Sequence, residues 1–232
     1  DVEGFDAAYK LYILSILAFH TKIPFSNIYR GGVTHITSED IQYGKQLGYS
    51  LKLLAIGKNT ADGIEVRVHP TYIKNTHPLA SVKDSYNAVY ITGDCVEDVM
   101  LYGRGAGAMP TASAIVGDVI YCATHPNFRY STFKNTEEAD PSTKFIDNFK
   151  SSYYLRLNAH DKAGVLAKVS SIFSRHNISV AQMIQEEDEK DGRVPLVFVT
   201  HLTKEKSVMK AVDDINATND IADVVSVIRV VS

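Results

Sequence analysis

The carboxy-terminal third of the chain alternates strands and helices in an order that few folds accommodate. Apolar and polar residues alternate at 153–159, and the apolar stripe of 164–176 has the spacing of an amphipathic helix. Four further segments are predicted: strands at 178–185 and 194–202, a helix at 205–215 and a strand at 224–231. The Asp191-Gly192 pair is expected to form the turn between the two middle strands. The order βαββαβ indicates a ferredoxin-like fold, built from two split βαβ halves.

The first half of the chain predicts helices that cover a largely antiparallel or mixed sheet. Thr37 and Asp40 resemble a capping box, and Asp62-Gly63 is a strong hairpin signal. Helices are expected at 4–19, 37–46 and 110–121, and strands at 50–57, 63–73, 87–93 and 96–101. The first of these helices is apolar on almost every side, so we expect it to be buried.

The predicted fold class is therefore α+β, with two domains. A sheet-and-helix layer domain is expected at 1–124 and the ferredoxin-like domain at 151–232. Residues 125–150 are polar, with few periodic apolar positions, and are interpreted as a connector.

Composition narrows the possible partners of the chain. The formal net charge is −3 and no basic cluster is present, which argues against a nucleic-acid-binding surface. No apolar run approaches the ~20 residues that span a bilayer, so a cytoplasmic protein without membrane contact is predicted. Cys95 and Cys122 lack metal-ligand spacing and are expected to be buried in a reducing compartment, with a single disulfide as the alternative. The eight histidines show no paired spacing, so no metal site is predicted.

The first ten residues gather charges at the start of the apolar helix. Asp6 and Lys10 stand four residues apart and therefore share one helix face, with Asp1 and Glu3 close by. On a solvated helix this pair is an ordinary salt bridge. At the head of a buried helix the same charges lie at the mouth of a core, which favours a site for chemistry.

A glycine-rich turn joins a predicted strand to the last helix of the first half. Gly103, Gly105 and Gly107 alternate before Pro110, a residue typical of a helix start. Such a turn lets a ligand approach exposed backbone N–H groups, although the spacing is not a dinucleotide fingerprint. From the residues alone, a ligand contact and a tight structural turn are equally supported.

Three stretches of sequence resemble known families. Residues 1–11 (DVEGFDAAYKL) and 103–114 (GRGAGAMPTASA) resemble the catalytic, substrate-binding domain of homoserine dehydrogenases. Residues 158–166 (NAHDKAGVL) resemble an ACT domain, an amino-acid-sensing module that many of these enzymes carry. The resemblance implies interconversion of L-aspartate 4-semialdehyde and L-homoserine with NAD or NADP, in the biosynthesis of threonine, methionine and isoleucine.

The resemblance also assigns roles to the charged residues of the first helix. Lys10 is implied to be the catalytic lysine, which neutralises charge on the carbonyl oxygen and donates a proton. Asp6 is implied to hold the substrate's ammonium group, and Asp1 to support the lysine. Glu3 is read equally well as a charge that complements the helix dipole.

Family resemblance implies, too, what this chain lacks. Homoserine dehydrogenases begin with a nucleotide-binding domain that carries GxGxxG, and no such motif occurs here. We therefore expect a carboxy-terminal portion of the enzyme, without the main cofactor-binding domain and inactive alone. Gly105 and Gly107 are then the expected cofactor contacts, and a homodimer or homotetramer is the expected assembly. Two alternatives are a stand-alone amino-acid-binding regulatory module without catalysis and an unrelated sheet-and-helix enzyme.

The strand-to-helix turn of the ACT-like segment is the expected effector site. Gly164 lets a ligand approach the helix N-terminus, which favours the effector's carboxylate, while Asn158 and Asp161 suit its ammonium or hydroxyl group. The resemblance implies threonine as the effector. The alternative is an ACT domain that binds nothing and serves assembly, and the apolar strands at 194–199 and 224–231 are candidates for pairing between copies.

Overall fold

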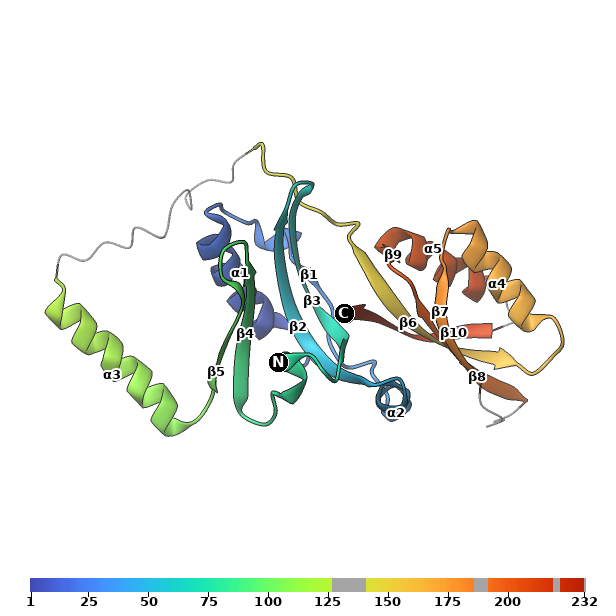
Figure 1. The fold of residues 1–232 in the computed structure, drawn as a ribbon, viewed down its shortest axis with the longest axis horizontal. Coiled ribbons are helices and arrows are strands. Elements are labelled where there is room, and N and C mark those ends of the chain that lie inside the picture. The colour runs from blue at the N-terminus through green and yellow to red at the C-terminus, as the bar shows by residue number, and fades with distance from the viewer. Residues whose placement is uncertain (127–140, 186–191, 219–221, 232) are drawn as a thin grey trace.

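A computed structural model gives the fold of residues 1–126, 141–185, 192–218 and 222–231 (Figure 1). The α-helices are α1 (Phe5–Phe19), α2 (Ser38–Gln46), α3 (Ala108–Thr124), α4 (Val165–Arg175) and α5 (Glu205–Asn216). The strands are β1 (Tyr29–Arg30), β2 (Tyr49–Thr60), β3 (Gly63–Lys74), β4 (Tyr86–Gly93), β5 (Glu97–Arg104), β6 (Lys150–His160), β7 (Val180–Gln185), β8 (Arg193–Thr200), β9 (Thr203–Lys204) and β10 (Ala222–Val231). Two short 3₁₀ helices lie at Phe25–Asn27 and Pro78–Ser81.

The carboxy-terminal third of the chain confirms the predicted ferredoxin-like fold. Its strands are antiparallel in the order β10-β6-β8-β7, and α4 and α5 pack together over one face. Alternate residues of β6 supply the core beneath these helices: Tyr153, Leu155, Leu157 and Ala159 are fully buried. The predicted Asp191-Gly192 turn falls partly outside the described residues, because Asp191 is not among them.

In the first half, a long antiparallel hairpin forms the platform for two helices. β2 and β3 pair from Tyr49↔Lys74 to Thr60↔Gly63, as the Asp62-Gly63 signal predicts. Ile64, Val66 and Val68 pack beneath α1, and Tyr72 packs beside Tyr43 of α2. These are alternate positions of β3, so α1 and α2 cover the same face of the sheet.

Helix α1 is less buried than its composition suggested. Ala8, Leu11, Ser15 and Ile16 face the hairpin, but Ile13 and Leu14 are 52% and 44% exposed. The prediction of an all-round buried helix is therefore wrong for this chain, because only one face of α1 meets the sheet.

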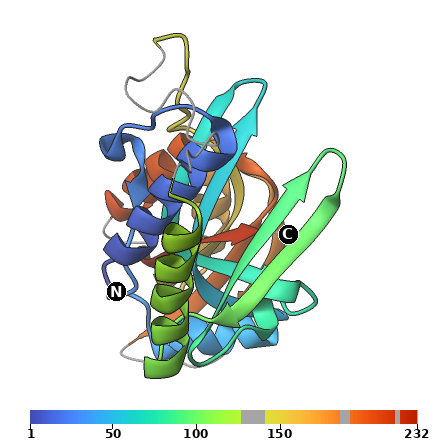
Figure 2. The ribbon, with the colours of Figure 1, turned by 90° about the vertical axis from the view of Figure 1, so that its left-hand side faces the viewer.

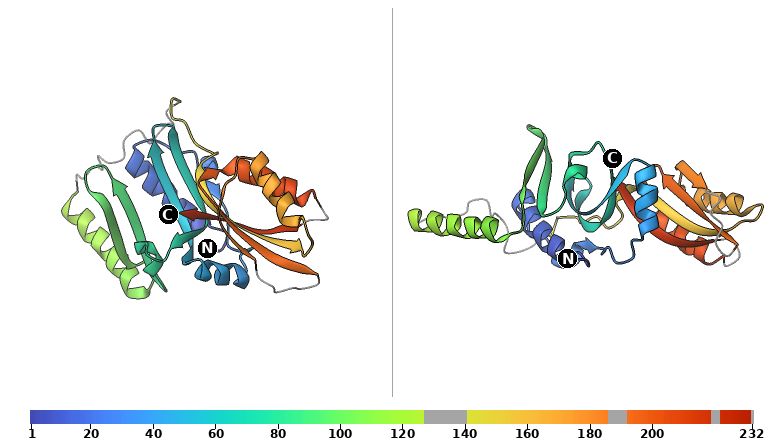
Figure 3. Two further views of the ribbon diagram at one scale, coloured as in Figure 1. Left: turned by 45° about the vertical axis from the view of Figure 1, so that its right-hand side comes forward. Right: turned by 90° about the horizontal axis from the view of Figure 1, so that it is seen from below.

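A second departure concerns the segment from β4 to α3. β4 and β5 pair only with one another, in a separate two-stranded sheet, and α3 extends from it without covering any other element (Figures 1 and 3). No residue of α3 is buried against the rest of the described chain, although most of the helix is apolar. The two cysteines lie here: Cys95 at the hairpin turn and Cys122 in α3 are both exposed and free, so their predicted burial is wrong.

One continuous sheet joins the two halves. Arg229, Val230 and Val231 of β10 pair in parallel with Thr71, Tyr72 and Ile73 of β3, which extends the carboxy-terminal sheet into the hairpin. β8 pairs on both edges, so it is not the free pairing edge that was predicted. β10 pairs with β3 only through Arg229, Val230 and Val231, so the predicted pairing through the rest of this strand stays a prediction. Among the described strands of the ferredoxin-like sheet, β7 pairs along one edge only, with β8.

The end of the predicted connector is also structured. Residues 127–140 lie outside the described part. After them, the Ile64 N–H donates to the Lys144 carbonyl, and the Ile146 N–H donates to the Ile64 carbonyl. Phe149 is buried, and its ring stacks on His69 at a centroid distance of 6.2 Å. Hence the connector ends along β3 rather than crossing solvent as a polar linker.

A row of buried polar side chains lies on the face of β3 opposite α1 and α2. Glu65, Arg67, His69 and Thr71 alternate with the apolar face and are each less than a tenth exposed. Arg67 binds Glu65 (Nε–Oε1 2.6 Å) and donates to His69 Nε2 at 2.7 Å. Burial, with Arg229 and Arg67 nearby, lowers the pKa of His69 to about 2, so its ring is neutral and can accept that bond. The buried charges here are therefore balanced by arginine–carboxylate pairs, Arg67 with Glu65 and Arg229 with Glu205.

Candidate functional site

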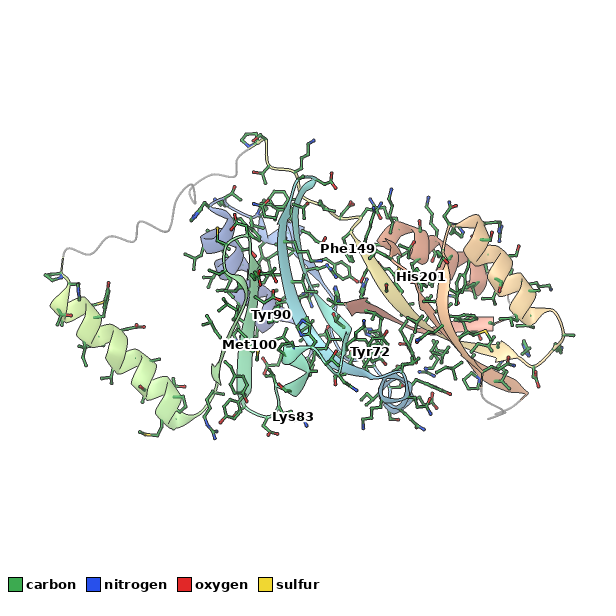
Figure 4. The ribbon with its side chains drawn as sticks, viewed as in Figure 1. Tyr72, Lys83, Tyr90, Met100, Phe149 and His201 are labelled. Atoms are coloured by element: carbon green, nitrogen blue, oxygen red, sulfur yellow. The ribbon has the colours of Figure 1, made fainter. Side chains whose placement is uncertain are left out.

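The charged start of α1 lines a cavity of about 800 Å³ between the sheet and the β4–β5 hairpin. Asp1, Asp6 and Lys10 form one wall, the edge of β2 a second, and β4 with the segment before it a third. Figure 2 shows the hairpin and α3 in front of α1 and β2, and Figure 4 shows Tyr90 on β4 and Lys83 at its lower end. Three segments far apart in the sequence therefore meet here.

Asp6 and Lys10 form the ion pair that their spacing predicts. Lys10 Nζ lies 2.8 Å from Asp6 Oδ2, and both side chains are more than half exposed. In water such an i,i+4 pair contributes about 0.3–0.5 kcal/mol to stability, so fold stability does not explain its place on the cavity wall. Its exposure leaves both groups accessible to a ligand.

Backbone geometry brings Asp1 to the same wall. Gly4 adopts a left-handed conformation (φ 77°) as the N-cap of α1, and its N–H donates to the Asp1 carbonyl at 2.9 Å. Gly32 lies so close to the first residues that a Cβ there would approach the Val2 carbonyl to 2.7 Å. Glu3 instead turns away toward Arg30, which donates to its carbonyl oxygen, and does not line the cavity.

The structure places the two predicted cofactor glycines differently. Gly105 lines the cavity, and a Cβ there would lie 1.8 Å from the Asn87 amide nitrogen, so the close approach depends on glycine. Gly107 does not line the cavity; it is the N-cap of α3 with φ 128°, a conformation that favours glycine. Its predicted role thus stays a prediction, whereas its structural role is clear.

Sequence reasoning missed two lysines of the cavity. Lys52 projects from β2, and Lys83 precedes β4; both line the cavity. Burial and the nearby Lys83 ammonium lower the pKa of Lys52. The available signal was a charged residue within the apolar run SLKLLAI, which an edge strand tolerates as a solvent-facing position.

At the predicted effector turn, two of the three residues lie together. Gly164 (φ 92°) is the N-cap of α4, and Asp161 is exposed three residues earlier. Asn158 lies on the face of β6 that carries Tyr154 and Arg156, opposite the α4 face, and pairs across to Asp223. Asp161 is thus three residues before the N-cap of α4, whereas the Asn158 side chain lies on the face of β6 opposite that helix.

Comparison with known proteins identifies the family. Residues 1–120 match the homoserine dehydrogenase family, and residues 153–218 match the ACT domain. The chain belongs to the homoserine dehydrogenase family. The resemblance to homoserine dehydrogenases and to an ACT domain is therefore confirmed, and so is the predicted α+β fold class.

Individual relatives are similar to this chain along almost its whole length. Homoserine dehydrogenases of Pseudomonas aeruginosa and Neisseria gonorrhoeae are 38% and 37% identical over 99% and 100% of the chain. A crystal structure of a homoserine dehydrogenase from Thiobacillus denitrificans superposes on all of it with a TM-score of 0.89 at 38% identity, and one from Staphylococcus aureus with 0.70 at 28%. The chain spans about half the length of the relatives it matches: 55% of the two related sequences and 54% of the chains in the two crystal structures.

Proposed function

We propose that this chain supplies the substrate-binding and regulatory half of a homoserine dehydrogenase, which interconverts L-aspartate 4-semialdehyde and L-homoserine. The supporting observation is one cavity that collects Asp1, Asp6, Lys10 and Gly105 from two distant segments. A stand-alone sensor has no need to place a lysine–carboxylate pair and a glycine turn on facing walls.

The proposed chemistry assigns the proton to this chain. NAD or NADP, when bound, supplies or accepts the hydride. Lys10 Nζ stabilises negative charge on the substrate oxygen and donates a proton to that oxygen in reduction; in oxidation the unprotonated amine accepts the hydroxyl proton. Asp6, 2.8 Å from Nζ, binds the substrate's ammonium group while the lysine engages the oxygen, and Asp1, which lines the same cavity, supports the lysine.

Two glycines fit the approach of a dinucleotide. Gly105 would present its backbone to the cofactor at the cavity wall, and Gly107 would offer backbone N–H groups at the start of α3.

Joining the chain to the amino-terminal portion of the Pseudomonas aeruginosa relative gives a direct test of activity; we refer to the product as the joined enzyme. We expect it to reduce NADP or NAD in the presence of L-homoserine, as measured by absorbance of the reduced nicotinamide. Each portion alone is the control and is expected to be inactive, because neither holds both walls of the site. A well-folded joined enzyme that leaves homoserine unreacted would contradict the proposal.

Threonine is the proposed effector, and its binding can be measured on the chain as it stands. Calorimetric titration of L-threonine should give saturable heat, which Asp161→Ala removes because the effector's ammonium or hydroxyl group loses its partner. Asp147→Ala is the matched control, since Asp147 is an exposed carboxylate paired with Lys206 away from the turn. No heat with threonine, isoleucine or methionine would instead favour an ACT domain that serves assembly.

Assembly and location follow from the same proposal. Large apolar side chains of α3 and of the β4–β5 hairpin are exposed, Met109 by 79%, which supports a homodimer or homotetramer in the complete enzyme. None of the described helices has the length and apolarity to cross a bilayer. We propose a cytoplasmic enzyme with no nucleic-acid or membrane partner.

A further inference from the structure

Lys52 occupies an unusual position for a lysine on an edge strand. It lies opposite Thr71 in the β2–β3 ladder and is half-buried, with its Nζ donating to the Val82 carbonyl. That carbonyl belongs to the segment that leads into β4, so the ammonium group is held at the cavity wall rather than extended into water.

The charges around the cavity leave Lys52 uncompensated. Lys10 is paired with Asp6. Asp84 also lines the cavity, but no ion pair joins Lys52 to a carboxylate among the described residues. The charge that affects the pKa of Lys52 is the Lys83 ammonium group. A half-buried cation beside another cation is unfavourable unless an anion joins them, and the lowered pKa of Lys52 reflects that cost.

We propose that Lys52 binds an oxyanion group of the molecule that fills this cavity: the carboxylate of the amino-acid substrate or a phosphate of the dinucleotide. The inference rests on the proposed function, because that function places a zwitterionic substrate and an anionic cofactor here. With Asp6 on the opposite wall, Lys52 gives the cavity an anion-binding side and a cation-binding side. Lys83, which is exposed, adds positive charge at the entrance.

A purely structural role makes a different prediction. If Lys52 only ties the segment at Val82 to the sheet, its loss should lower stability and leave ligand affinity unchanged. The two roles therefore separate in the Michaelis constants of a folded variant.

Lys52→Met in the joined enzyme tests the proposal. We expect the KM of homoserine or of the dinucleotide to rise about ten- to a hundredfold, since a charge-assisted hydrogen bond to the ligand is lost. A rise for homoserine alone identifies the substrate carboxylate, and a rise for the dinucleotide alone identifies a phosphate. Lys52→Arg, which keeps the charge, should restore most of the affinity. Lys58→Met is the matched control on the same strand, exposed and outside the cavity lining.

Amine labelling of the unmodified joined enzyme gives a second measurement that does not depend on a variant's folding. Homoserine or the dinucleotide should protect Lys52, and not Lys58, when the labelled peptides are quantified by mass spectrometry. Unchanged KM values in a folded Lys52→Met, or labelling of Lys52 that saturating ligands leave unaffected, would overturn the proposal. An inactive joined enzyme would count against the proposed function, whereas an active one with those results counts against Lys52 alone.

Discussion

Lys10→Met in the joined enzyme is expected to reduce the turnover of homoserine by about two to four orders of magnitude, the range that a positioned proton donor contributes. The methionine keeps the length of the side chain but can neither donate a proton nor stabilise an oxyanion. The loss should appear in kcat more than in the KM of the dinucleotide, because the interaction forms in the transition state. Steady-state kinetics with each substrate varied in turn measure both.

The same substitution should barely change stability. Lys10 and Asp6 are more than half exposed, so their pair contributes little to folding, and the melting temperature should stay within a few degrees of the parent. Lys168→Met, on the exposed face of α4, controls for the loss of one surface charge. Turnover that survives in a folded Lys10→Met would exclude Lys10 as the proton donor and remove the main support for the assigned chemistry.

Arg156→Met is expected to have the largest effect on stability, about 3–5 kcal/mol, as when one partner of a buried ion pair is removed. Arg156 extends from β6 of the ACT domain into the start of α2, where its Nε lies 2.7 Å from Asp40 Oδ1 and its Nη1 lies 2.6 Å from Glu39. Asp40 is fully buried and also closes the capping box with Thr37. Without the guanidinium, its carboxylate loses the only cation of the described residues that pairs with it. Urea unfolding of the chain measures the change.

A double-mutant cycle and a pH series sharpen that result. Arg156→Met combined with Asp40→Asn should recover part of the lost stability, because no unpaired buried charge remains. Arg175→Met is the control: it breaks an exposed pair and should cost at most about 1 kcal/mol.

The pH dependence of stability gives a further check on Asp40. Burial raises the pKa of Asp40, but hydrogen bonds from Arg156 and Thr37 outweigh this effect, and the net shift is downward. The contribution of Asp40 to stability is therefore present above its unfolded pKa of about 3.8 and lost as the pH falls through the lower folded value. An Arg156→Met variant within 1 kcal/mol of the parent at neutral pH would show that this pair does not join the halves.

Local pattern was enough to predict most elements of this fold. The period-two and period-3.6 patterns placed the ferredoxin-like strands and helices, and Thr37 with Asp40 does form the expected capping box. Asp6 and Lys10 could be paired from their spacing alone, since an i,i+4 contact needs only a helix. These signals all act within a few residues.

Features that depend on distant partners could not be predicted in this way. The pairing of β10 with β3 joins residues more than 150 positions apart, and the apolar pattern of either strand is the same with or without it. Burial of α1 and α3 was overestimated because an apolar helix in sequence does not reveal which of its faces has a partner within this chain. Lys52 was overlooked for the same reason: a lysine in an edge strand usually faces water, and only the position of the β4 segment makes it part of a cavity.

The shared sheet means that the ACT domain is not a detachable appendage. A truncation at residue 150 would remove β10 and leave Thr71–Ile73 of β3 as a bare edge, ready to pair with another molecule. It would also take away Glu205, Arg229 and Tyr153, which adjoin the polar row of Glu65, Arg67 and His69. The proposed regulation is therefore better removed by changing the effector turn than by cutting the chain, because the cut would expose this edge of β3 to aggregation.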